Sequence, residues 1–575
     1  MSTKSINSML CALALCTGLA GAPSLAADST IPGTGAVTGT VTAARPFTAA
    51  QVYLRNLDKP VTFMVYTSGG KYRAINLLPG TYEATVARRG FASEPQKISV
   101  RPGETVTADF ALKDADPAPT AGINGPSTVV AYPGRATILD KDVEFVRDYD
   151  TLYPPGPGRV VLEHACMSCH GVNVFSQKQW DHAAWDAAVT MMSRREGMVG
   201  IIVPPGKLTP SDRRLLVDYL AANFGPTAKK RALASDADMP LDEEALRNAM
   251  YVEYDMPKAD AANARPRGQN PYLDNDGNVW VTDRGAPNAI VRLDPRTATL
   301  RAFPLPEQGG PHGITVDASG TVWWGENRWP KLGSLDPESG KITHHLMDPR
   351  EVLGANTQAQ DPIVDSQQNV WFTVIVGNRI GKWDRKSGKI SLWEPPTPNS
   401  YPYGIDKDKS DNIWFSQFVQ CRVTKFDPKT EEFTEYPVLT AYSDPYCLIR
   451  RLGLDGKGMV WYAVFSHGVI GKLDPATGKM VEYKIPMAFS QPYDIWPDRE
   501  DNLWISDGGM GGALIRFNPG TEKFTVYPSM QRGDMPKLEI TREGAVWYSP
   551  RSAQRGTVGV LYPDVTKMRS FEARY

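Results

Sequence analysis

The chain has 575 residues and a formal net charge of −1, and its length alone predicts about three or four domains. Hydrophobic residues make up 41% and charged residues 22%, which is a globular composition and excludes a disordered chain. The balanced charge gives no basic excess, so we expect no nucleic-acid partner. The 50 glycines, 47 prolines, 14 tryptophans and 23 tyrosines are typical of a turn-dense, β-rich chain.

Residues 1–27 are predicted to be a cleaved export signal. Lys4 precedes the short apolar run MLCALALCTGLAGA, and the small residues of SLAAD place cleavage near Ala26 or Ala27. The alternative is a membrane anchor, but the run is short for a bilayer span, and no other apolar run has spanning length. We therefore predict a periplasmic protein with no stable membrane span.

Residues 31–113 are predicted to form a small β-sandwich. The stretch AINLLPGTYEATVARRGFASEPQKISVRPGETVTADFAL alternates apolar and polar residues between Gly/Pro turns, which indicates short antiparallel strands. Its segments LLPGTYEATVARRGF and VRPGETVTADFAL resemble the carboxypeptidase regulatory-like, transthyretin-like domains. The resemblance implies a spacer or docking module without catalysis. Residues 114–157, rich in proline and glycine at KDADPAPTAGINGPSTVVAYPG, are predicted to be a linker.

The motif CMSCHG, which begins at Cys166, predicts covalent attachment of one haem c. Two thiols separated by two residues can reach the two vinyl groups of a porphyrin, and the histidine directly after the second cysteine can then ligate the iron. Cys166 and Cys169 are the predicted attachment sites and His170 the proximal ligand. A zinc site or a redox dithiol is the alternative, but no second ligand pair follows and a βαβ context is missing.

Residues 158–226 resemble a small class I-type cytochrome c domain, which is all-α. Thr209 can cap its last helix, Pro210 suits the first position, and Gly225 suits the exit. The stretch WDAAVTMMSRREG resembles the distal-ligand segment of short cytochrome domains attached to periplasmic dehydrogenases. By that resemblance Met192 is the distal iron ligand, with Met191 and Met198 as alternatives and core packing as a further alternative.

Residues 245–575 contain a repeat that predicts a seven-bladed β-propeller. Segments such as NDGNVWVTDRG, KSDNIWFSQFV and REDNLWISDGG recur every 43 to 48 residues, and each is followed by a strand such as IGKLDPATGKM. The strand NAMYVEYDMP at 248–257 is expected to close the ring as the outer strand of the last blade. The repeated tryptophans are Trp280, Trp323, Trp371, Trp414, Trp461, Trp504 and Trp547.

The repeated sequence pattern is similar to that of the streptogramin B lyase family of propellers. The segments that carry the resemblance best are GGPHGITVDASGTVWWGENRWPKLGSLDP and YPYGIDKDKSDNIWFSQFVQCRVTKFDP. The resemblance covers about 300 residues and implies the fold. Members with lyase activity need a histidine base and metal-binding glutamates on the top face. His467 is near a family-like base position, but its own blade has Val464 where a glutamate would be, so a full glutamate pair is not evident.

Two sets of positions are expected near the mouth of the propeller channel. The residue after each blade-opening proline begins the inner strand, and another position follows each repeated tryptophan by three residues. The first set is His312, Gln360, Tyr403, Tyr446 and Tyr493, and the second is Asp283, Glu326, Val374, Gln417, Val464, Asp507 and Pro550.

From these sets we take His312, Glu326 and Tyr403 as the candidate catalytic residues. His312 would be the base, Glu326 or Asp283 would orient it or bind a cation, and the tyrosines would pack a flat ligand. The alternative is a polar ring that only solvates the channel.

Two further cysteines, Cys421 and Cys447, are expected near each other at the tops of blades four and five, and they are predicted to form a disulfide in an oxidising compartment. His344 and His345 are expected on the surface of an outer strand.

Three functions follow from these patterns. The first is a periplasmic oxidoreductase that oxidises a small organic substrate at the propeller and passes electrons through the haem to an external cytochrome or oxidase. The second is a streptogramin lyase-like lyase or hydrolase with an attached cytochrome, and the third is a non-catalytic electron-transfer or binding protein. Neither a divalent cation nor a quinone has support, and the adjacent cysteine pair of many quinone-dependent propellers is missing.

Overall fold

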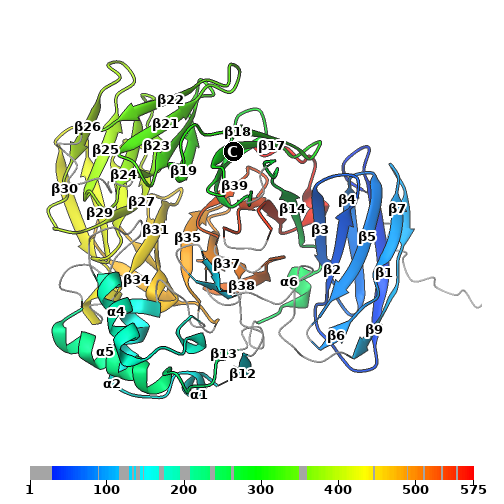
Figure 1. Cartoon of the computed structure of the whole chain (residues 1–575). Helices are drawn as coiled ribbons and strands as arrows, with labels where there is room; N and C mark the ends of the chain where they lie inside the picture. Colours follow the sequence, from blue (N-terminus) through cyan, green and yellow to red (C-terminus); the bar gives the residue numbers. More distant parts are fainter. Residues whose placement is uncertain are drawn as a thin grey trace, which may run out of the picture.

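The computed structural model describes residues 29–88, 90–114, 129–131, 135–137, 143–146, 148–167, 174–193, 208–233, 240–260, 264–348, 359–443, 447–487, 490–508, 512–531, 535–551 and 555–575. The predicted export signal lies outside these ranges. In this part of the chain no helix has both the length and the apolar character needed to cross a membrane. Figure 1 shows a β-sandwich on the right, a group of helices at the lower left and a ring of β-sheets between them.

The predicted N-terminal sandwich is confirmed. One sheet has the order β4-β1-β9-β6, with β8 also paired to β1, and the other contains β3-β2-β5-β7. The alternation seen in the sequence places side chains such as Tyr82, Ala84 and Val86 of β5 inside. The strands are β1 (Gly35–Ala43), β2 (Gln51–Asn56), β3 (Val61–Tyr66), β4 (Lys71–Leu77), β5 (Gly80–Ala87), β6 (Phe91–Ala92), β7 (Gln96–Val100), β8 (Thr105–Thr107) and β9 (Phe110–Asp114).

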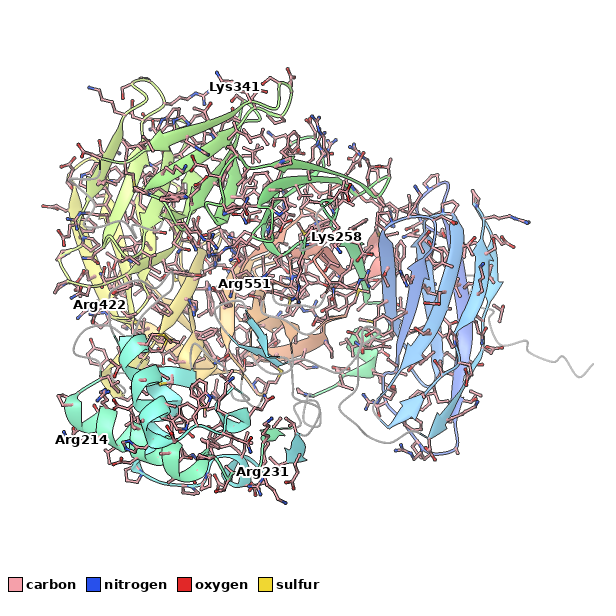
Figure 2. The ribbon with its side chains drawn as sticks, in the orientation of Figure 1. Arg214, Arg231, Lys258, Lys341, Arg422 and Arg551 are labelled. Atoms are coloured by element: carbon pink, nitrogen blue, oxygen red, sulfur yellow. A yellow bond between two sulfur atoms is a disulfide. The ribbon has the colours of Figure 1, made fainter. Side chains whose placement is uncertain are left out.

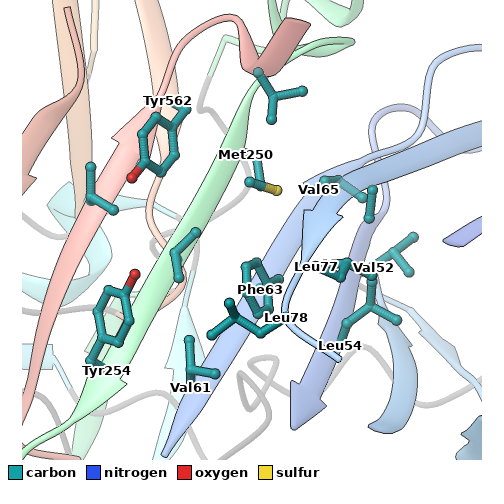
Figure 3. Close-up of a cluster of buried hydrophobic side chains, with 14 of the residues drawn as sticks. Val52, Leu54, Val61, Phe63, Val65, Leu77, Leu78, Met250, Tyr254 and Tyr562 are labelled. Carbon is teal, nitrogen blue, oxygen red and sulfur yellow. The ribbon is translucent and has the colours of Figure 1, made fainter. Parts of the chain in front are cut away.

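Strand β14 (Met250–Asp255) joins the sandwich to the propeller. It pairs antiparallel with β41 (Thr557–Tyr562) on one side and with β3 on the other, so one eight-stranded sheet runs through both domains. Figure 3 shows this junction, where Met250 and Tyr254 of β14 belong to one buried apolar cluster with Tyr562 of β41 and Phe63 of β3. The strand predicted at 248–257 therefore does close the ring, and it also carries the sandwich.

The helices lie between the sandwich and the propeller in the sequence. They begin before residue 158, within the stretch predicted to be a linker, and β12 (Glu144–Val146) and β13 (Arg231–Leu233) pair in parallel on either side of them. The remaining elements are β10 (Val129–Ala131), β11 (Arg135–Thr137), α1 (Tyr149–Leu152), α2 (Pro157–Val161), the π-helical turn η1 (Leu162–Met167), the 3-10 turn η2 (Phe175–Gln177), α4 (His182–Ser193), α5 (Pro210–Asn223) and α6 (Glu243–Leu246).

Local sequence explains how α5 begins and how it meets α2. Thr209 caps α5, as the sequence predicts, and the structure adds a reciprocal capping box with Asp212. A Cβ atom at Gly158 would lie 2.2 Å from the carbonyl oxygen of Leu215, so only glycine allows α2 and α5 to cross this closely.

The predicted seven-bladed propeller is confirmed as six four-stranded sheets and a seventh, β39-β40-β41-β14, that continues into the sandwich. Figure 1 shows the blades in chain order from green through yellow to red. Blades one to three contain β15 (Gly268–Leu273), β16 (Val279–Asp283), β17 (Ala289–Asp294), β18 (Thr299–Pro304), β19 (Pro311–Val316), β20 (Val322–Glu326), β21 (Lys331–Leu335), β22 (Ile342–Leu346), β23 (Ala359–Val364), β24 (Val370–Val374), β25 (Arg379–Trp383) and β26 (Ile390–Trp393).

Blades four to seven complete the ring. Their strands are β27 (Pro402–Lys407), β28 (Ile413–Gln417), β29 (Arg422–Asp427), β30 (Glu432–Pro437), β31 (Ile449–Leu454), β32 (Val460–Val464), β33 (Val469–Leu473), β34 (Met480–Lys484), β35 (Pro492–Pro497), β36 (Leu503–Asp507), β37 (Ala513–Asn518), β38 (Lys523–Pro528), β39 (Leu538–Ile540), β40 (Val546–Tyr548) and β41. The short helices α7 (Leu439–Ser443), η3 (Phe465–His467) and η4 (Val565–Lys567) lie at their ends.

An aspartate–tryptophan hydrogen bond holds the first hairpin of six blades. In blade three, Oδ2 of Asp365 accepts from the Trp371 indole at 2.9 Å, while Oδ1 accepts from the backbone N–H groups of Gln367 and Asn369. The same indole contact recurs in the other five, from Asp274, Asp317, Asp408, Asp455 and Asp498. Blade seven has Thr541 at this position, and the Trp547 indole nitrogen makes no hydrogen bond among the described residues.

This contact generates a stability prediction. Asp365→Ala removes an acceptor from a buried indole and from two backbone N–H groups, so we expect the free energy of unfolding to fall by about 2–3 kcal/mol. The change is measured by thermal and denaturant melts followed by tryptophan fluorescence. Thr541→Ala, at the matched position without the indole contact, should cost less than about 1 kcal/mol. Equal losses in the two variants would contradict the assignment.

Candidate functional site

The first residues of the inner strands meet at the centre of the propeller. In blades one to six the strand contains a β-bulge, and the residue that follows its first paired position projects into a buried polar cluster. These residues are Gln269, His312, Gln360, Tyr403, Arg450 and Tyr493, each at most 2% exposed.

His312 is bound through both of its ring nitrogens. Its Nδ1 lies 3.3 Å from Oδ1 of Asp361 in blade three, and its Nε2 lies 3.1 Å from the side-chain nitrogen of Gln269 in blade one. Asp361 is also paired with both terminal nitrogens of Arg451 and accepts from the Asn270 amide at 3.3 Å. The network thus ties together the inner strands of blades one, two, three and five.

Burial and charge set the protonation states of this pair. Burial, aided by the nearby Arg284 and Arg451 and opposed by Asp361, lowers the pKa of His312 to about 3. Burial alone would raise the pKa of Asp361, but Arg451 and then His312 outweigh it and lower that pKa to about 2. At neutral pH the site therefore contains a neutral imidazole beside an ionised carboxylate.

Tyr403 lies next to His312, within an aromatic group. The two rings meet edge to face with centroids 6.2 Å apart, and the Tyr403 hydroxyl shares a 2.5 Å hydrogen bond with that of Tyr493. The guanidinium of Arg450 lies over the rings of Tyr403, Tyr493, Phe418 and Phe465, at 4.2–5.3 Å from their centroids.

Arg551, labelled near the middle of Figure 2, donates to the Gln269 side-chain oxygen at 3.4 Å. It thereby joins blade seven to the network around His312.

Glu326 does not share this centre with His312. Its carboxylate is fully buried within blade two, where it lies 3.7 Å from the Lys331 ammonium and 3.3 Å from the His344 imidazole and accepts from the Trp324 indole. Burial is the main cause that raises its pKa. The carboxylate that contacts His312 is therefore Asp361, and neither Glu326 nor Asp283 has that role.

The other positions three residues after the repeated tryptophans make hydrogen bonds or apolar contacts within the blades. Asp283 accepts from the backbone N–H groups of Arg267 and Gly285, and Asp507 accepts from Gln491 N–H. Val374 and Val464 pack in apolar clusters. These contacts stabilise the strand ends, and the expectation that these positions lie near the channel mouth stays a prediction.

The structure also bears on the expectations for Tyr446, for His467 and for the pair His344 and His345. Tyr446 lies outside the described residues, and Arg450 occupies the matched inner-strand position in blade five. His467 hydrogen-bonds through Nδ1 to the neighbouring Ser466 hydroxyl at 2.8 Å. His344 and His345 do lie on the outer strand β22, but both are half-buried, and His345 stacks on Trp323.

A constant spacing in the sequence would have found Arg450. His312, Tyr403 and Tyr493 each precede the repeated tryptophan of their blade by eleven residues (323 − 312, 414 − 403 and 504 − 493). The same count from Trp461 leads to Arg450, whereas the Pro445–Tyr446 dipeptide imitates a blade opening four residues too early.

Cys421 and Cys447 are joined by a disulfide with a Cα–Cα distance of 5.7 Å. Cys447 lies just before β31, the strand that carries Arg450 and Arg451. The bond therefore fixes the chain beside the central cluster.

The predicted haem segment is described in part. Cys166 is half-buried and packs against the apolar cluster of the helices, whereas Cys169, His170 and Met198 lie outside the described residues. On α4 the Met191 side chain is 54% exposed and Met192 is half-buried.

The same segment touches the propeller. The Gln491 side chain, at the start of blade six, donates to the Met167 carbonyl at 3.4 Å.

Comparison with known families matches two parts of the chain. Residues 250–515 match the model of the virginiamycin B lyase family, and residues 36–113 match that of the carboxypeptidase regulatory-like domain. The first range contains the whole His312–Asp361–Arg451 network. Neither range includes residues 158–226, and no curated protein matches the chain.

Solved structures give further similarities. The virginiamycin B lyase from Staphylococcus aureus is 20% identical, covering 54% of this chain and 99% of that chain with a TM-score of 0.47. A streptogramin B lyase is 21% identical, covering 54% and 97% with a TM-score of 0.47. The WD40 β-propeller domain of Doa1 is 9% identical, covering 53% and 95% with a TM-score of 0.43.

The lyase resemblance implies a metal ion held by glutamates, and the described side chains do not fit such a site. Glu326 is bound to Lys331, a cation that already occupies the place beside its carboxylate. Over the described residues, no three His, Cys, Asp or Glu side chains group as a metal ion would require. We therefore derive no step through a metal.

The protonation state of His312 predicts a pH dependence of stability. Its pKa is about 3 in the folded chain and near 6.5 when unfolded, so only the unfolded chain takes up a proton as the pH falls through this window. The stability from His312 is complete above pH 6.5 and is lost as the pH falls toward 3, by about 1.4 kcal/mol per pH unit at most.

His312→Gln cannot take up this proton. Between pH 6.5 and about pH 5 it should therefore lose less stability than the wild type, by up to about 2 kcal/mol, in denaturant melts at each pH. His182→Gln is the control, because it removes a histidine that is exposed on α4. Parallel slopes for His312→Gln and wild type would rule out the buried neutral imidazole.

Proposed function

We propose that the propeller is a lyase of the virginiamycin B lyase type, in which His312 accepts a proton from a small organic substrate. The observation that carries the proposal is the buried His312 imidazole, whose Nδ1 lies 3.3 Å from the carboxylate of Asp361. It lies within the range that matches the lyase family. A neutral imidazole has a lone pair for a proton, and Asp361 is placed to stabilise the imidazolium that forms.

The proposed reaction is an elimination next to a carbonyl group. Nε2 of His312 takes the proton, the electrons of the broken C–H bond form a C=C bond, and the leaving group departs with the electrons of its own bond. Tyr403 and Tyr493 give the site flat apolar faces beside His312, which suits an unsaturated or aromatic ligand.

The proposal predicts a particular product. When the purified full-length protein is incubated with cyclic esters and depsipeptides, including quinupristin, mass spectrometry should show a ring-opened product of unchanged mass. A hydrolase would instead add one water. His312→Asn should lower kcat/KM by about 10²- to 10⁴-fold, because the proton acceptor is lost.

His182→Asn, on the distant helix α4, is the matched control and should retain wild-type kcat/KM. A product heavier by one water would replace the lyase with a hydrolase. Full activity of His312→Asn would remove His312 from the chemistry.

We propose secondly that the helices carry one haem c and make the protein an electron carrier or oxidoreductase of the periplasm. The specific support is the C-x-x-C-H motif, together with the half-buried Cys166 thiol in an apolar cluster and the contact of this segment with blade six. Cys166 and Cys169 would hold the haem, with His170 and Met192 as iron ligands. When bound, the haem would supply one-electron transfer, with an external cytochrome or oxidase as the acceptor.

The chain's own residues constrain this second function. Met192 is the half-buried methionine of α4, whereas Met191 points to solvent, which favours Met192 as the distal ligand. Gln491 joins the haem segment to the strand that carries Tyr493, so the helices and the central cluster are in contact through one strand.

Haem attachment is tested on protein exported to the periplasm. The wild type should retain haem after denaturation, and Cys166→Ala should lose the second thioether and shift the α-band of the pyridine adduct to longer wavelength. Met192→Ala should abolish the methionine–iron charge-transfer band of the oxidised protein, whereas the matched variant Met191→Ala should retain it. Absence of covalent haem from the wild type would end this proposal.

A further inference from the structure

The protonated nitrogen of His312 follows from its neighbours. Gln269 has two polar ends, and its oxygen accepts from Nη1 of Arg551, which is a donor only. If the amide were reversed, its NH₂ group would face the guanidinium, donor against donor. The NH₂ group therefore faces Nε2 of His312, at 3.1 Å, and requires a lone pair there.

The other ring nitrogen completes the assignment. With the lone pair on Nε2, the proton of the neutral imidazole is on Nδ1, which lies 3.3 Å from Oδ1 of Asp361. Asp361 also receives hydrogen bonds from Arg451 and Asn270. All three neighbours are donors, so the carboxylate stays an acceptor, and its bond to Arg451 holds it in place.

Two glycines make this approach possible. A Cβ atom at Gly313, directly after His312, would lie 2.3 Å from Oδ1 of Asp361, and a Cβ atom at Gly404 would lie 2.6 Å from Cα of Arg451. The His–Gly and Tyr–Gly pairs of blades two and four thus leave space for the polar residue of the next inner strand.

We propose that Asp361, fixed by Arg451, is a positioning residue that holds His312 as the Nδ1–H tautomer. In the absence of substrate, the Gln269 amide donates a hydrogen bond to the lone pair of Nε2, and a bound substrate displaces that amide. The inference rests on the proposed role of His312 as a base. It adds that the base is covered at rest, so that a substrate must replace the amide donor of Gln269 before proton transfer begins.

The tautomer is measured without turnover. The full-length protein is labelled with ¹⁵N-histidine, and two-bond ¹H–¹⁵N correlations at neutral pH should show His312 with a protonated Nδ1 and an unprotonated Nε2. An Nε2–H tautomer or an imidazolium in the wild type would overturn the proposal before any variant is made.

Variants separate positioning from structure. Asp361→Asn should lower the Nδ1–H population and reduce kcat at least tenfold while KM changes less than twofold. Asp283→Asn, at a buried aspartate that accepts from the backbone N–H groups of Arg267 and Gly285, should leave the His312 signals unchanged. Gln269→Leu should shift the Nε2 resonance toward that of a free lone pair and keep the tautomer.

Each outcome is decisive. If Asp361→Asn leaves the tautomer unchanged, or Gln269→Leu leaves the Nε2 resonance unchanged, the proposal fails. If Asp361→Asn does not fold, Arg451→Lys breaks the two-nitrogen pairing that fixes the same carboxylate and must also lower the Nδ1–H population. A correct tautomer in a protein without lyase activity would remove the proposed function and leave the positioning intact.

Discussion

The pairing of β14 with β41 closes the ring, and the central site depends on that closure. Blade seven draws three strands from the end of the chain and one from residue 250 onward, so the ring exists only when strands about 300 residues apart are paired. Closure brings the inner strands of blades one and seven together, where Arg551 reaches Gln269. Without that contact the Gln269 amide would lose the partner that orients it toward His312.

The blades contribute to the centre in a regular way. Aspartate–tryptophan bonds fix the first hairpin of six blades at one end, and the bulged inner strands deliver one side chain per blade at the other. Because these inner-strand positions have the same geometry in each blade, the chemistry of the centre depends on which residue occupies each of them. The sequence has placed a histidine, an aspartate and two arginines on the inner strands of blades two, three and five, and Asp361 and Arg451 offset each other's burial cost.

Local patterns predicted the fold well, namely the repeated tryptophans, the alternating strands and the capping signal at Thr209. They also predicted His312 and Tyr403 as residues of the central cluster. Asp361 and Arg451 were missed because their importance arises between blades, and a sequence shows neighbours along the chain only. Glu326 was misplaced because its side chain turns into blade two, where it pairs with Lys331.

The double pairing of β14 also bears on the order in which the chain can fold. β14 lies about 190 residues after β3, its partner on one side. Its partner on the other side, β41, lies about 300 residues further along the chain. A sandwich that forms early can hold β14 extended along one edge and leave the opposite edge open. The N-terminal domain then acts as a template on which the ring is completed, which lowers the entropy cost of the longest-range pairing in the molecule.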